Sequence, residues 1–133
     1  MNRYAALYLA TLLVILPLDF LFLGVVAKGY FATQVGSMLG DVKPVPAVLF
    51  YLVYVAGTVI FVSGVAGASW QSTLLYGALF GFFCYATFEL TSLAILKHWS
   101  WGVAAMDITW GALMTAVAST AGLLVADWVA AKT

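Results

Sequence analysis

The sequence of 133 residues contains 65% hydrophobic and only 8% charged residues. A soluble domain carries roughly 25% charged residues, so this composition excludes a water-soluble globule and predicts an all-α integral membrane protein. The formal net charge is zero, which argues against nucleic acid as a partner and leaves the lipid bilayer as the expected one. Cys84 is the only cysteine, which excludes an internal disulfide, and we expect it to be a packing residue.

Four apolar stretches predict a bundle of four transmembrane helices within a single domain, residues 1–133. A spanning helix needs roughly 20 mostly apolar residues, because every backbone polar group must be satisfied inside the segment. The first stretch is too long for a signal peptide and precedes no small-residue cleavage site, so we expect a retained anchor. The predicted helices are about Tyr4–Ala27, Val45–Val65, Thr73–Leu96 and Val103–Ala126.

The segments between these helices differ in kind. The first is the longest polar stretch, and the spacing of its apolar residues predicts a short interfacial helix over about Gly29–Leu39. The connection around residues 97–101 is very short, so the third and fourth helices should form an antiparallel hairpin. Lysines are slightly more frequent in these two connections than basic residues are at the termini, which by the positive-inside rule places both termini outside.

Three acidic residues lie within the predicted spans: Asp19, Glu89 and Asp107. An ionisable side chain inside the bilayer is costly and marks a functional site by default. Because alternate helices run in opposite directions, all three acids fall on the side of the first and third connections, the first two about 12 Å below that surface. We therefore expect the three carboxyls to share one pocket.

The neighbours of these acids support a polar site inside the bundle. Gly111, Thr115 and Gly122 form a stripe of small residues on the face of Asp107, which predicts that this face packs against other helices. Trp110 lies one turn from Asp107, Tyr85 and Ser92 flank Glu89 one turn to either side, and two tyrosines of the second helix enter from the same side of the bilayer. The predicted ligand- or proton-binding residues are Asp19, Glu89, Asp107, Tyr85, Ser92, Trp110, Tyr51 and Tyr54.

No predicted span carries a Lys or Arg partner for these acids, so three neighbouring carboxyls in a low dielectric cannot all be ionised. They can bind protons, a cation or a hydroxyl-bearing ligand, or they can serve as structural hydrogen bonds between helices. We expect His98 to be an interfacial anchor. No metal-binding or nucleophile motif is present, so we predict no metal and leave the cofactor open. The remaining tryptophans are expected in the interface belts: Trp70, Trp99, Trp101 and Trp128.

Four runs of the sequence resemble a bacterial membrane family catalogued as domain of unknown function 2177. They are LDFLFLGVVAKGYF, LFYLVYVAG, YATFELTSLAILKHW and DITWG, in the family's order between about Thr11 and Gly122. The family pattern has Trp where this chain has Phe22, and Tyr-Asp-Leu-Thr-Asn where it reads Phe-Glu-Leu-Thr-Ser over 88–92. The resemblance implies a four-helix protein of the bacterial inner membrane and singles out the same acids, but it implies no activity.

Three functions follow as alternatives. The first is a protein that binds or transports a proton or a small amphiphilic ligand. The second is a membrane enzyme that acts on a lipid-soluble substrate, with Glu89 or Asp107 as general acid or base, and the sequence leaves open whether the protein is an enzyme. The third is an accessory subunit of a larger membrane complex or a homo-oligomer, in which the acids only hold helices together.

Overall fold

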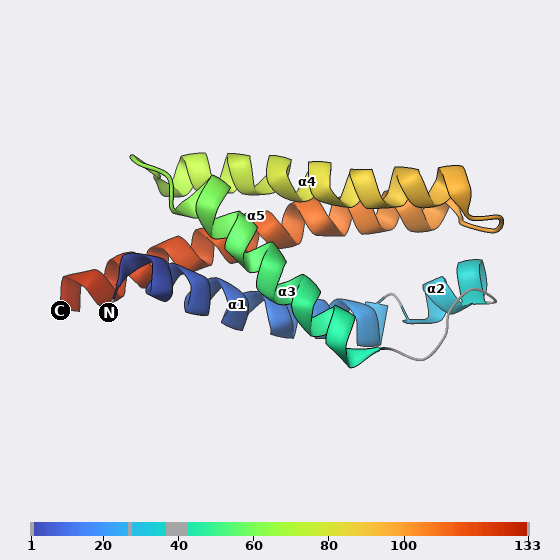
Figure 1. The fold of residues 1–133 in the computed structure, drawn as a ribbon, viewed down its shortest axis with the longest axis horizontal. Coiled ribbons are helices and arrows are strands. Elements are labelled where there is room, and N and C mark those ends of the chain that lie inside the picture. Colours follow the sequence, from blue (N-terminus) through green and yellow to red (C-terminus); the bar gives the residue numbers. More distant parts are fainter. Residues whose placement is uncertain (1, 27, 37–42, 133) are drawn as a thin grey trace.

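The computed structural model describes residues 2–26, 28–36 and 43–132, and all its regular elements are helical (Figure 1). Two of the long helices end in a π-helical turn. In chain order the elements are α1 (Arg3–Leu21), the π-helical turn η1 (Phe22–Val26), α2 (Lys28–Val35), α3 (Pro44–Thr58), the π-helical turn η3 (Val59–Ser63), α4 (Trp70–Ile95) and α5 (Trp101–Lys132).

Four of these helices are long and apolar enough to cross a membrane: Arg3–Val25, Pro44–Ser63, Trp70–Ile95 and Trp101–Lys132. This confirms the predicted fold class, a four-helix transmembrane bundle. The protein is therefore a multi-pass membrane protein.

The helix bounds differ from the predicted ones by a few residues. The second span begins at Pro44 and ends at Ser63, two residues before the predicted end, and the first span ends at Val25. Helix α4 begins at Trp70, because Ser69 and Ser72 form a reciprocal capping box there.

Helix α5 differs most from its predicted range, because it continues to Lys132 rather than ending at Ala126. Two charged residues of its last turns have partners. Asp127 pairs with Arg3 at 2.9 Å, and the Lys132 ammonium lies 5.7 Å from the centre of the Trp128 ring.

The predicted interfacial helix corresponds to α2, which ends at Val35, and residues 37–39 of the predicted range lie outside the described residues. The Ser100 hydroxyl donates to the Gln34 side chain at 2.8 Å, and the Tyr30 hydroxyl lies over the position of a Cβ at Gly102. Helix α2 is therefore packed against the start of α5. Its location in the membrane interface stays a prediction.

Helix α5 is the centre of the bundle and packs along both α4 and α1 (Figure 1). Small residues make these approaches possible. A Cβ at Gly81 of α4 would collide with the backbone of Gly111 and with Thr115, and a Cβ at Gly122 would collide with Thr11 of α1. The predicted small-residue stripe therefore faces two helices, α4 and α1.

Helix α3 crosses the bundle diagonally (Figure 1). Its η3 end contacts α1, α4 and α5, while the helix itself packs on α1, where the Tyr8 hydroxyl donates to the carbonyl of Leu52 at 2.9 Å. Toward Pro44 the helix diverges from α4 in this view. The cavity described below is lined by residues of this diverging part of α3, from Pro46 to Tyr54.

Candidate functional site

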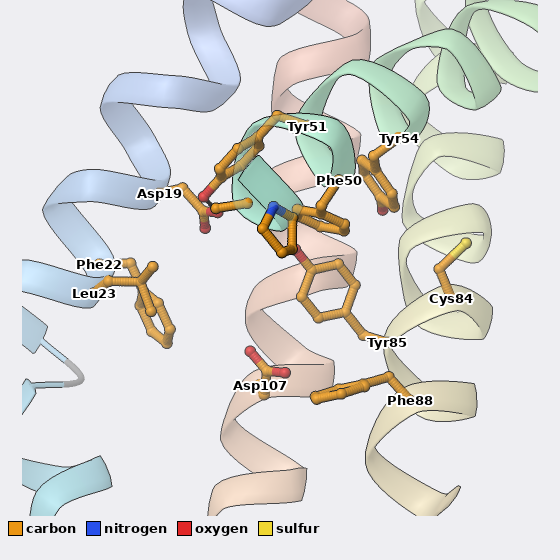
Figure 2. A pocket seen from close by; sticks show the side chains of 12 residues that line it. Asp19, Phe22, Leu23, Phe50, Tyr51, Tyr54, Cys84, Tyr85, Phe88 and Asp107 are labelled. Carbon is orange, nitrogen blue, oxygen red and sulfur yellow. Dashed lines mark hydrogen bonds between the residues drawn. The ribbon is translucent and has the colours of Figure 1, made fainter. Parts of the chain in front are cut away.

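A cavity of about 610 Å³ lies among α1, η1, α3, α4 and α5 (Figure 2). Its volume falls within the roughly 300–1,000 Å³ of typical small-molecule sites. Its walls are mainly aromatic and aliphatic, with two carboxyls among them. The lining residues are Asp19, Phe22, Leu23, Pro46, Ala47, Phe50, Tyr51, Tyr54, Cys84, Tyr85, Phe88 and Asp107.

Asp19 is held from two directions by hydrogen-bond donors. The Tyr51 hydroxyl of α3 donates to one carboxyl oxygen, and the Trp110 indole N–H of α5 donates to the other at 2.9 Å. The Trp110 ring is itself fixed, because Phe22 stacks on it at a centroid distance of 4.4 Å. Only 5% of Asp19 is exposed, so three helices fix this carboxyl inside the bundle.

Asp107 and Glu89 form a second acidic group, contributed by α5 and α4. The Asp107 side chain interacts with that of Glu89 and lies within electrostatic range of Asp19. Glu89 is 1% exposed, and one of its oxygens accepts the Trp99 indole N–H at 2.8 Å. Neighbouring helices thus bring two carboxyls together beside the cavity.

Two tyrosines bound the cavity on the side facing the chain termini. The hydroxyls of Tyr54 and Thr115 share a hydrogen bond of 2.7 Å, which joins α3 to α5. The Tyr85 ring of α4 meets Tyr54 edge to face at a centroid distance of 5.9 Å, and it lies over Gly111, where a Cβ would collide with it. Glycine at 111 thus makes room for Tyr85.

The structure places the predicted residues in three groups. Asp19, Asp107, Tyr51, Tyr54 and Tyr85 all line the cavity.

Trp110 does not line the cavity but donates to Asp19, while Glu89 lies next to Asp107 and does not line it either. Ser92 is buried and is not part of the lining. Five of the eight predicted residues therefore line one cavity.

Some residues of the site were not predicted. Trp99 was expected in an interface belt, yet its indole N–H donates to Glu89. Phe22, Phe50 and Phe88 form much of the cavity wall, and Cys84, expected only to pack, also lines it. Helical spacing from the acids signals Phe22, three residues after Asp19, but no spacing rule relates residues across the α4–α5 turn.

The polar side chains that line the cavity are carboxyls, phenols and one thiol. No lining residue of this cavity is basic. Within the described residues, no group of three or more His, Cys, Asp or Glu side chains is arranged to hold a metal ion.

These features define a class: a small membrane protein of four transmembrane helices with acidic side chains inside the bundle. Residues 4–124 match the family described as a predicted membrane protein (DUF2177), and the chain belongs to this family. The resemblance seen in the sequence is thereby confirmed. No curated protein and no solved structure matches the chain.

Proposed function

We propose that this membrane protein binds a small amphiphilic ligand in the acid-lined cavity. The observation that carries the proposal is the cavity of about 610 Å³ beside Asp19, whose carboxyl is fixed by Tyr51 and Trp110. If the carboxyl only joined helices, we would expect the helices to pack closely around it, because atoms that line an empty cavity lose dispersion contacts. A ligand would restore those contacts and use the fixed carboxyl to orient its polar group.

The pair of Asp107 and Glu89 supports a second part of the proposal, exchange of a proton when ligand binds. Both carboxyls belong to buried or half-buried positions of the bundle, and they interact with each other. A charged ligand in the cavity would change how readily the pair holds a proton. Binding of the ligand would then be accompanied by uptake or release of a proton. The same pair would serve as acid and base if the protein proved to be an enzyme.

The test is retention of a small molecule by protein purified in mild detergent, measured by native mass spectrometry. We expect the wild type to retain a molecule and Cys84→Trp to lose it, because the indole would occupy the cavity that Cys84 lines. Leu13→Trp is the matched control, since Leu13 lies on α1 at 69% exposure and is not part of the lining.

The outcomes separate the proposal from its alternatives. Equal retention by Cys84→Trp and the wild type would place any bound molecule elsewhere and overturn the proposal. Turnover of the retained molecule would indicate an enzyme. A wild type without a small molecule, purified together with other membrane proteins, would favour the accessory subunit.

A further inference from the structure

The cavity has a lateral mouth toward lipid. Besides Pro46, three large apolar residues of its lining are substantially exposed: Leu23 at 42%, Phe50 at 44% and Phe88 at 56%. They belong to η1, α3 and α4, and Figure 2 shows them around the cavity with α5 behind it. We call these three residues the mouth.

Two of the three mouth residues lie deep enough in their spans to face hydrocarbon, whereas Leu23 is two residues from the Val25 end of its span. Phe50 lies six residues inside the Pro44 end of its span and Phe88 seven residues inside the Ile95 end of its span. At 1.5 Å per residue both are about 10 Å along the helix from those ends. Toward the termini the same gap between α3 and α4 is closed by ring contacts, Tyr54 with Phe80 at 5.6 Å and Tyr54 with Tyr85.

The inner end of the cavity has the opposite character. Asp19 and Asp107 lie there, Glu89 adjoins Asp107, and no lining residue is basic. The carboxyls of this end therefore have acceptor oxygens but no positively charged neighbour in the lining. A ligand with a positively charged group would supply the missing partner, so such a group is the complementary one.

The aromatic walls near these carboxyls favour the same partner. Phe22, Tyr51, Tyr85 and Phe88 all line the cavity, and ring faces attract an ammonium group in a desolvated site. An anionic head group would meet acids without a basic partner. A neutral hydroxyl could form hydrogen bonds there but would bring no positive charge to the carboxyls.

On these grounds, and resting on the function proposed above, we infer that the ligand is a cationic amphiphile that reaches the cavity sideways from the bilayer through the mouth. Its ammonium head lies between Asp19 and Asp107, and its hydrocarbon tail passes Leu23, Phe50 and Phe88 into lipid. The site therefore selects a bilayer-dissolved amine rather than a water-soluble one.

Binding of radiolabelled n-dodecylammonium to the protein in phosphatidylcholine nanodiscs tests the head group, with empty nanodiscs subtracted. We expect dodecylammonium to bind about tenfold or more tightly than n-dodecanol, and dodecyl sulfate not to bind specifically. Asp107→Asn should weaken the binding of dodecylammonium by a similar factor. Asp19→Asn is a second variant in case the first does not fold. Asp127→Asn is the matched control, because Asp127 lies at the other end of the bundle and pairs with Arg3.

A photoreactive diazirine at the tail end of the same amine tests the mouth. Mass spectrometry should locate the cross-link at Leu23, Phe50 or Phe88, and cross-links confined to the chain ends would overturn the lateral route. Dodecanol binding as tightly as dodecylammonium, or Asp107→Asn binding like the wild type, would remove the cationic class while leaving a neutral ligand possible. Failure of all three amphiphiles to bind would count against the proposed function itself.

Discussion

At the scale of single residues, the position of Asp19 depends on side chains from other helices. Its two oxygens each accept one donor, from Tyr51 and from Trp110, so neither oxygen has to be satisfied by its own helix. Hydrogen bonds to a charged group are stronger than neutral ones and are costly to lose inside a low-dielectric site. The carboxyl is therefore both a site residue and a link between α1, α3 and α5.

Trp110→Phe tests this link. The substitution removes the indole N–H but keeps a ring that stacks on Phe22, so the loss is mainly one charge-assisted hydrogen bond. We expect a loss of about 1.5–3 kcal/mol in stability, seen as a lower midpoint of thermal unfolding in detergent. Trp128→Phe is the control because Trp128 is 62% exposed, and an equal shift in both variants would contradict the argument.

Glu89→Gln separates a structural role of the second acidic group from a functional one. An amide oxygen can still accept the Trp99 indole N–H and an amide can still bond to Asp107, so we expect thermal stability within about 1 kcal/mol of the wild type. The amide cannot exchange a proton. We consequently expect ligand retention by Glu89→Gln to depend less on pH than retention by the wild type, measured by native mass spectrometry over a series of pH values.

If ligand retention by Glu89→Gln varied with pH as retention by the wild type does, Glu89 would have only a structural role. Trp99→Phe complements this test, because it leaves the buried Glu89 oxygen without its donor and should destabilise the fold.

At the scale of elements, the close approach of α4 and α5 depends on glycine at particular positions. A Cβ at Gly81 would meet the Gly111 backbone, which cannot move as a flexible side chain can. Gly81→Ala should therefore destabilise the bundle by about 1–3 kcal/mol, measured by thermal unfolding. Gly24→Ala is the control, since a Cβ there meets nothing within 4 Å, and similar losses in both variants would show that the approach is not limiting.

The sequence predicted the elements better than the site. Four spans follow from apolar length alone, since the bilayer requires each of them to satisfy its own backbone. The common depth of Asp19, Glu89 and Asp107 followed from counting residues along alternating helices.

The rest of the site depends on how the helices are rotated and crossed, which residue counting does not fix. Helical spacing suggested Tyr85 and Ser92 as partners of Glu89, whereas the structure gives it Trp99 from beyond the turn. The diagonal path of α3, which produces the cavity between Phe50 and Phe88, has no signature in a uniformly apolar helix.

At the scale of the whole molecule, the two ends of the bundle differ. One end has the chain termini and the ion pair of Arg3 with Asp127, whose side chains are 46% and 54% exposed. Such an exposed pair contributes less than about 1 kcal/mol. The other end has α2 and the α4–α5 connection, and the acid-lined cavity lies nearer to it. The acid-lined cavity thus lies nearer one end of the bundle than the other.

This polarity gives a topological prediction. Four spans place Lys43 and Lys97 on one side of the membrane and Ala66, between α3 and α4, on the other, and all three residues are exposed. In a Cys84→Ser background, single cysteines at 43 and 97 should react alike with a membrane-impermeant maleimide, and a cysteine at 66 should react in the opposite way. The positive-inside rule further predicts labelling at 66 in intact cells and at 43 and 97 only after lysis. If positions 43 and 97 were labelled differently from each other, the four-span arrangement would be contradicted. A reversed pattern at all three positions would keep the four spans and place the cavity nearer the outer face of the membrane.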